Sequence, residues 1–269
     1  MNKNQPFYNA IMEDALRACQ VAHDAAYMPE LAEERIKAKN DSSLWNDWWT
    51  TPSLRITGTT KGGSKVVLYV HDQTSWTNPE ELKYAREHHK NGAGPFSQKE
   101  FDALADRVDD GKVFKVDYDV LKRSTSGVII VDAALEHPQT IPFLGGEDVA
   151  KRYLAKHREV YEDNIWIWHS DDLAEEPRGR LLVLGNLHNL NLFGYGNLNG
   201  NARFLGVRRS VSEANRVAPI GADAKKSLSH SLDQVVAEVL SASEGLVADA
   251  LKGKFEKEVR RNLRKFYKP

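Results

Sequence analysis

The chain of 269 residues contains a single cysteine, Cys19. An intramolecular disulfide is therefore impossible, and zinc sites built from four cysteines, or from two cysteines and two histidines, are excluded. Scarce cysteine is typical of proteins in a reducing compartment. The N-terminus, MNKNQPFYNAIMEDAL, also lacks a basic segment followed by an apolar run. We therefore expect no secretory signal peptide and a cytoplasmic, intracellular location.

Charged side chains are missing from one segment, Leu181–Ala202, although 28% of the chain is charged. This neutral segment, LLVLGNLHNLNLFGYGNLNGNA, contains six Asn and four Gly. Its length would suit a membrane helix, but each amide buried in lipid would need a hydrogen-bonding partner, so no membrane span is predicted. Apart from His188 it offers no group for acid–base chemistry. Amides and glycines suit hydrogen-bonded recognition, and we interpret the segment as a recognition surface. A compact loop satisfied by its own amides is the alternative.

The common catalytic motifs are missing as well. The chain has no Walker A loop and no Gly-x-Ser-x-Gly nucleophile elbow, and no apolar helix follows Gly194-Tyr195-Gly196 as a dinucleotide-binding loop requires. The best catalytic candidates are His169, Asp171 and Asp172, which follow an apolar strand and could supply a general base. Ordinary solvated side chains at the end of a strand are the alternative.

A second histidine–carboxylate pair, His71-Asp72, ends another predicted strand in the same way. If the two strands are neighbours, His71, Asp72, His169 and Asp171 could bind a divalent metal through nitrogen and oxygen. This arrangement would indicate a metal-dependent hydrolase or nuclease. No other cofactor is predicted.

Charge is distributed unevenly along the chain. Residues 1–51 hold 5 basic and 8 acidic side chains, a net charge of −3, whereas residues 203–269 hold 14 basic and 8 acidic ones, a net charge of +6. A basic C-terminal part indicates an anionic macromolecular partner, protein or nucleic acid, or association of the chain with itself. An ordinary solvated helix face is the alternative. The basic residues proposed to contact a partner are Arg203, Arg208, Arg209, Lys254, Lys257, Arg261, Arg264 and Lys268.

Hydrophobic periodicity predicts an α+β fold, with a mixed sheet of six to eight strands and flanking helices. We expect a helical N-terminal segment (1–50), a mixed α/β core (51–217) and a helical C-terminal appendage (218–269) that form one cooperative domain. The tryptophans of LWNDWW are expected to be buried where the first helices meet the core. Predicted helices cover 6–27, 29–40, 79–90, 98–108 and 147–161, and 141–146 is predicted as a loop. Predicted strands cover 54–57, 65–71, 113–116, 127–131, 165–169, 181–184 and 204–207.

The same patterns predict the burial of two strands, the pairing of two others and the turn between them. GVIIV (127–131) and the strand at 165–169 are expected to be buried on both faces. The strand at 181–184 is expected to pair with that at 204–207, and Asn199-Gly200 predicts a type I′ hairpin turn between them.

No catalytic pattern outweighs its ordinary structural interpretation, so the sequence favours a non-catalytic binding or assembly protein with a macromolecular partner. The metal-dependent hydrolase is one alternative. A small anionic ligand or nucleotide bound at the neutral segment is the other. Its ligands would be Asn186, Asn189, Asn191, Asn197 and Asn199, with Arg203, Arg208 or Arg209 meeting the anion.

Overall fold

A computed structural model of the chain describes residues 5–107, 110–169, 173–185, 192–194 and 196–207. The chain divides into two compact units, Met1–Arg208 and Arg209–Pro269, and all described residues belong to the first. The predicted C-terminal appendage therefore lies outside the described residues. Among the described helices, none combines the length and the apolarity that crossing a bilayer requires.

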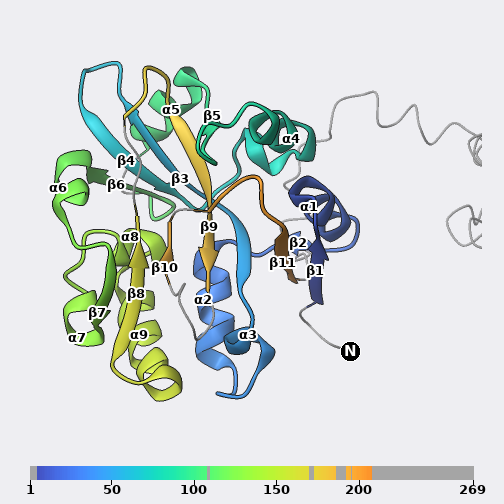
Figure 1. Ribbon diagram of the computed structural model, residues 1–269, viewed down its shortest axis with the longest axis vertical. Coiled ribbons are helices and arrows are strands. Elements are labelled where there is room, and N and C mark those ends of the chain that lie inside the picture. Colours follow the sequence, from blue (N-terminus) through green and yellow to red (C-terminus); the bar gives the residue numbers. More distant parts are fainter. Residues whose placement is uncertain (1–4, 108–109, 170–172, 186–191, 195, 208–269) are drawn as a thin grey trace, which may run out of the picture. The chain divides into compact units, whose positions relative to one another are not determined.

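The described part has the predicted α+β fold, built on a mixed sheet with flanking helices (Figure 1). Its strands are β1 (Gln5–Asn9), β2 (Asp24–Ala25), β3 (Trp49–Thr59), β4 (Lys65–Val70), β5 (Gly94–Pro95), β6 (Val113–Asp117), β7 (Gly127–Ile130), β8 (Asn164–Trp168), β9 (Arg178–Leu184), β10 (Leu192–Phe193) and β11 (Ala202–Val207). Its helices are α1 (Met12–Gln20), α2 (Met28–Lys37), α3 (Ser43–Asn46), the 3₁₀ helix η1 (Ser75–Thr77), α4 (Pro79–Glu87), α5 (Gln98–Ala105), α6 (Tyr118–Arg123), α7 (Val131–Ala134), α8 (Thr140–Leu144) and α9 (Glu147–Tyr161).

The main path of the sheet runs β1-β11-β3-β9-β10-β8-β7, and β4 and β6 extend it beyond β3. With eleven strands the sheet is larger than predicted, partly because β2, β5 and β10 are only two residues long. The hairpin of β3 and β4 is confirmed, with Thr59 opposite Lys65.

Local capping signals predicted several helices correctly. The Asn78 side chain accepts a hydrogen bond from the Glu80 N–H at the start of α4, and Pro79 occupies the first turn. The Ser97 hydroxyl does the same for the Glu100 N–H at the start of α5. Helix α9 begins at Glu147 and ends at Tyr161, as predicted.

The helix predicted over residues 6–27 is confirmed only for Met12–Gln20, and both of its ends are strands instead. Residues Gln5–Asn9 form strand β1, which pairs with β11 and places Tyr8 opposite Arg203. Helix α1 begins at Met12. In the turn before it, the Ile11 N–H donates a hydrogen bond to the Asn9 side chain. Pairing with a strand almost 200 residues away in the sequence overrides the local helical pattern, because sheet pairing satisfies the same backbone groups.

The predicted loop at 141–146 is also wrong, since its first part forms α8. This helix ends at Leu144, and the C-cap residue that follows it, Gly145, has a φ of 83°. A Cβ atom at Gly145 would overlap the ring of Pro29, so both the backbone conformation and the close packing require glycine.

The predicted pairing of the strand at 181–184 with the strand at 204–207 is not found. Strand β9 pairs with β3, β5 and β10, whereas β11 pairs with β1, β2 and β3, so β3 separates the two strands. A turn is present, because the Gly200 N–H donates to the Asn197 carbonyl at 3.1 Å. Neither Asn199 nor Gly200 has a positive φ, so it is not the predicted type I′ turn.

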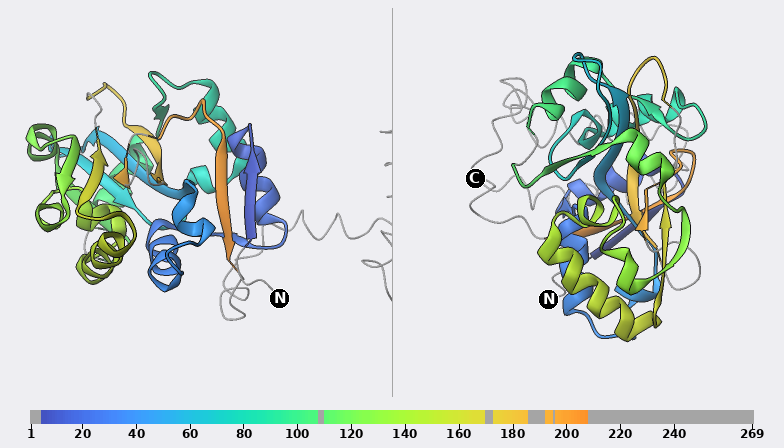
Figure 2. Two further views of the ribbon diagram at one scale, coloured as in Figure 1. Left: turned by 60° about the horizontal axis from the view of Figure 1, so that its bottom comes forward. Right: turned by 90° about the vertical axis from the view of Figure 1, so that its left-hand side faces the viewer.

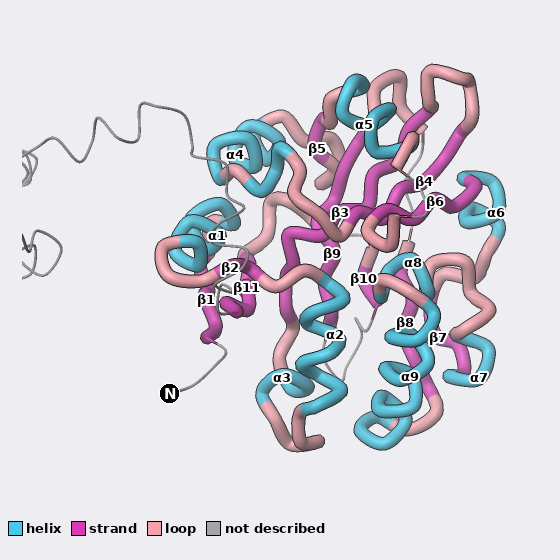
Figure 3. The backbone as a smooth tube through the Cα atoms, turned by 180° about the vertical axis from the view of Figure 1, so that it is seen from behind, coloured by secondary structure: helices cyan, strands magenta, loops and turns pink. Residues whose placement is uncertain are grey.

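Two apolar cores lie on opposite faces of the sheet. One packs α2, α8 and α9 against β8, β9 and β10. The other packs α1, α4 and α5 against β3, β4 and β11. Figure 3 views the molecule from behind, and in this view α2, α8 and α9 lie in front of the sheet. In the left view of Figure 2, the dark-blue α1 lies well apart from the olive α9. Each core is therefore covered by its own set of helices.

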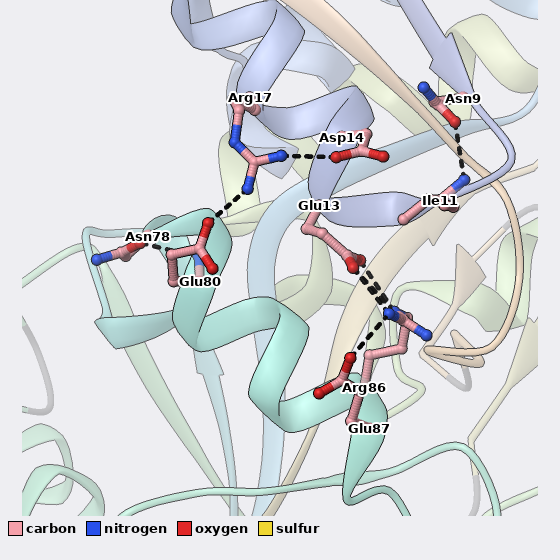
Figure 4. Close-up of polar contacts among 9 residues, drawn as sticks. All are labelled: Asn9, Ile11, Glu13, Asp14, Arg17, Asn78, Glu80, Arg86 and Glu87. Carbon is pink, nitrogen blue, oxygen red and sulfur yellow. Dashed lines mark hydrogen bonds and ion pairs between the residues drawn. The ribbon is translucent and has the colours of Figure 1, made fainter. Parts of the chain in front are cut away.

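A buried ion pair joins α1 to α4 (Figure 4). Both carboxylate oxygens of Glu13 accept from Arg86, at 2.8 Å from Nη2 and 3.0 Å from Nε. Burial alone would raise the pKa of Glu13, but the hydrogen bonds and positive charge of Arg86 outweigh it and hold the pKa below its usual value. The carboxylate is thus charged and paired where α1 meets α4, and a second, exposed ion pair between Arg17 and Glu80 joins the same two helices.

Candidate binding surface on the open sheet face

Strand β8, predicted to be buried on both faces, is buried on only one. Ile165 and Ile167 point into the core beneath α9 and are fully buried, whereas Trp166 and Trp168 lie on the opposite face and are half-buried. The two indole rings stack, with centroids 5.8 Å apart and planes 16° from parallel. The strand therefore presents an aromatic pair away from the core.

Strand β7, which was also expected to be buried on both faces, is exposed on one. It forms one end of the main sheet path and pairs with β8, with Val128 opposite Trp166. The Val128 side chain is 44% exposed and that of Ile130 is 58% exposed. These are outward positions of an edge strand rather than interior ones.

The neutral segment continues this row of outward side chains. Through β10 it places Phe193 directly opposite Trp168 of β8 on one side and Val183 of β9 on the other. Directly opposed residues share a face of the sheet, so the side chains adjoin. We call this set the open-face patch: Val128, Ile130, Trp166, Trp168, Val183 and Phe193. In Figure 1 the viewer looks onto β8, β10 and β9, and α2 and α9 lie behind them.

The described residues of the neutral segment alternate between buried and outward positions. Leu192, Gly194, Gly196 and Leu198 are buried, whereas Phe193 is half-buried and Asn197 and Asn199 are exposed. Of the predicted binding residues, Asn197 and Asn199 are therefore accessible, and the Asn199 N–H donates to the Asn197 side chain at 2.9 Å. The others from this segment, Asn186, Asn189 and Asn191, lie outside the described residues.

Arg203, predicted to meet an anion, is already engaged in the fold. Its guanidinium forms an ion pair with Asp47 at 2.5 Å and lies 5.5 to 5.7 Å from the ring centroids of Tyr8, Trp48 and Trp49. Cation–π contacts and the carboxylate compensate its charge. The remaining basic candidates, Arg208, Arg209, Lys254, Lys257, Arg261, Arg264 and Lys268, lie outside the described residues. Of the three nearby tryptophans, Trp45 and Trp49 are buried as predicted, and Trp48 is half-buried.

The described members of the predicted metal set have separate partners. The His71 ring bonds the Ser53 hydroxyl at 3.0 Å and the Pro142 carbonyl at 2.8 Å. Asp72 forms ion pairs with Arg107 and Lys112. Within the described part of the chain, no group of three or more His, Cys, Asp or Glu side chains is placed to hold a metal ion. His71, Asp72 and His169 thus do not converge, and Asp171 and Asp172 lie outside the described residues.

His169 lies beside a small cavity of about 150 Å³ that Arg55 and Ser124 also line. Its Nε2 is 3.0 Å from the Ser124 hydroxyl. Burial, with smaller contributions from the positive charges of His137 and Arg55, lowers the pKa of His169 to about 4. A general base works best with a pKa near the working pH, so this imidazole is poorly suited to that role at neutral pH.

No protein-family model matches the chain, and no curated protein matches it. Among solved structures, the chain is similar to one described as "Accommodation of massive sequence variation in Nanoarchaeota by the C-type lectin fold", with a TM-score of 0.74. The fold is therefore the C-type lectin fold. The two sequences are 50% identical, and the match covers 76% of this chain and 97% of the other. The chain belongs to the same family as this C-type lectin-fold protein.

This relationship supports the predicted binding protein and gives no support to the metal-dependent hydrolase. The aromatic members of the open-face patch, Trp166, Trp168 and Phe193, were absent from the predicted site. The sequence carries no signal for two of them, because isoleucine and tryptophan in NIWIW are both apolar and the apolar–polar alternation of a half-exposed strand is missing.

Proposed function

We propose that this chain is a binding protein that recognises a protein partner through the open-face patch and the outward side chains of the neutral segment. The observation that carries the proposal is the continuity of the two surfaces, since Phe193 of the segment lies between Trp168 and Val183 in the sheet. Aromatic side chains at the centre of an exposed surface are typical of protein interfaces.

The charge of the surface favours a protein over a nucleic acid. None of the six patch residues is charged, and the neutral segment contains no Lys or Arg. Binding to nucleic acid draws most of its affinity from cations placed against phosphates. An uncharged aromatic surface instead suits a folded protein surface, and the exposed Asn197 and Asn199 of the neutral segment would supply adaptable hydrogen bonds.

The solved relative supports a further part of the proposal. Its structure is described as accommodating massive sequence variation in the C-type lectin fold. We propose that this chain likewise presents side chains that can differ between family members while the fold stays the same. In this proposal Asn186, Asn189, Asn191, Asn197 and Asn199 contribute to the variable contacts.

The test compares proteins captured by the immobilised full chain with those captured by the Trp168→Ser/Phe193→Ser variant. Val21→Ser is the matched control, since Val21 is apolar and 81% exposed but is not part of the patch. We expect proteins retained by the wild type and by the control to be lost from the patch variant, and a purified partner to bind the variant at least tenfold more weakly. Equal capture by all three chains would contradict the proposal.

A parallel measurement distinguishes the nucleic-acid alternative. Fluorescence anisotropy with labelled single-stranded DNA and RNA would be recorded at several salt concentrations. We expect no binding at physiological salt. Tight binding that weakens steeply with salt would favour a nucleic-acid partner instead.

A further inference from the structure

The neutral segment is held to the scaffold by buried polar side chains from outside it. Gln139, at the start of α8, is fully buried, and its Nε2 donates to the Leu192 carbonyl at 3.1 Å and to the Trp168 carbonyl at 3.2 Å. Its Oε1 accepts from the Tyr69 hydroxyl at 2.9 Å. Because Tyr69 occupies the oxygen, the amide group is oriented with both N–H donors toward β8 and β10.

Buried arginines supply further donors to the same segment. Arg180 of β9 donates to the Gly196 carbonyl at 3.3 Å and to the Asn91 carbonyl at 2.6 Å. Arg55 of β3 approaches the Gly194 carbonyl at 3.5 Å. At the other end, Arg35 of α2 donates to the carbonyls of Leu184 and Gly185. The segment is thus bound at several points along its main chain.

The inward positions of the segment leave no room for a side chain. A Cβ atom at Gly194 would lie 2.8 Å from the Gln139 Oε1, and one at Gly196 would overlap the Leu181 carbonyl. The Gly194 N–H also donates to the Trp168 carbonyl at 2.9 Å. Glycine at these two positions lets the backbone approach the scaffold directly.

We infer that Gln139, Arg180, Arg55 and Arg35 are positioning residues that fix the shape of the described part of the recognition surface through hydrogen bonds to its backbone carbonyls. A carbonyl oxygen is the same acceptor in every residue type, so these hydrogen bonds do not depend on the outward side chains. The side chains of Phe193 and Asn199 can then change and set the specificity for the partner while the backbone under them stays in place. At position 197 the replacement must still accept from the Asn199 N–H, as a serine hydroxyl can. This inference rests on the proposed function for the role of the surface.

Amide hydrogen exchange of the full chain tests the inference at Gly194. In Gln139→Met, which removes both donors but keeps the side-chain length, we expect exchange at 192–194 to accelerate at least tenfold and exchange in α4 to be unchanged. In Phe193→Ser and Asn197→Ser, we expect exchange at Gly194 within twofold of the wild type and a melting temperature within about 2 °C. A structural contribution alone would not confine the change to residues 192–194.

Two outcomes would overturn the inference: unchanged exchange in Gln139→Met, or exchange that accelerates equally in the two outward variants. If Gln139→Met fails to fold, Tyr69→Phe removes only the hydroxyl that orients Gln139, and the same local acceleration is expected. Partner binding of the same variants is a separate readout. If the Phe193→Ser variant binds the partner with full affinity, the proposed function is wrong. The exchange data would still show whether Gln139 holds the segment in place.

Discussion

Substitution of Gly196 by alanine should destabilise the protein although the new side chain is a single methyl group. The added Cβ would lie well within 3.0 Å of the Leu181 carbonyl oxygen, closer than real Cβ atoms come to other atoms. Leu181 is buried in β9 opposite Leu54 of β3, so the oxygen cannot move without disturbing the centre of the sheet. The chain around Gly196 must instead move away from β9.

The magnitude follows from two losses and one gain. Overpacking a buried site costs about 1–3 kcal/mol, and the hydrogen bond from the Arg180 guanidinium to the Gly196 carbonyl contributes about 1.5–3 kcal/mol. Alanine also restricts the unfolded chain more than glycine does, which offsets at most about 0.4–1 kcal/mol of this cost. The expected net loss in the free energy of unfolding is about 1.5–5.5 kcal/mol.

Urea unfolding monitored by tryptophan fluorescence measures this loss. All six tryptophans lie between residues 45 and 168, so the signal reports on the described unit. Gly62→Ala is the matched control, because its Cβ would lie 3.8 Å from the nearest atom and its φ is not positive. We expect the control to be neutral or stabilised by about 0.4–1 kcal/mol. A Gly196→Ala protein within about 0.5 kcal/mol of the wild type would refute the close-packing account.

Two further predictions concern charge. Arg86→Leu should leave the Glu13 carboxylate buried without its partner and cost about 2–4 kcal/mol in urea unfolding, and adding Glu13→Gln should recover part of that loss; no recovery would mean that the pair is not coupled. Burial lowers the pKa values of His71, His157 and His169 to about 4. The unfolded chain therefore binds more protons below pH 6.5, and the free energy of unfolding should fall as pH drops from 6.5 toward 4, by up to about 1.4 kcal/mol per pH unit for each histidine; a flat profile between pH 6.5 and 5 would contradict this.

Features governed by neighbouring residues were predicted well from the sequence. Asn78 and Ser97 cap α4 and α5 because their side chains reach N–H groups two or three residues ahead. The β3–β4 hairpin also depends on adjacent residues. In these places the local pattern contains all the groups that interact, so the pattern is sufficient.

Features governed by distant partners were not predictable in this way. The local sequence pattern of Gln5–Asn9 predicts a helix, and only the pairing with β11 makes these residues a strand. Strands β7 and β8 read as doubly buried because their valine, isoleucine and tryptophan side chains are apolar on both faces, and hydropathy does not report which face the helices cover. The same limit applied to the site. Gln139 lies in a stretch without any catalytic or binding motif, and its role follows only from the carbonyls of Trp168 and Leu192 that the fold brings to it.

The lack of charge in the neutral segment follows from the way the scaffold holds it. Its carbonyls accept from the guanidinium groups of Arg35, Arg55 and Arg180. A carboxylate in the segment would be a stronger acceptor than a carbonyl and would compete for these arginines, which would draw its side chain inward. A lysine or arginine would add positive charge near guanidiniums already buried in a medium of low dielectric constant. Asparagine avoids both effects and still offers hydrogen bonds outward. If the neutral segment is the proposed recognition surface, its uncharged composition leaves the backbone carbonyls as the acceptors for the buried guanidinium groups.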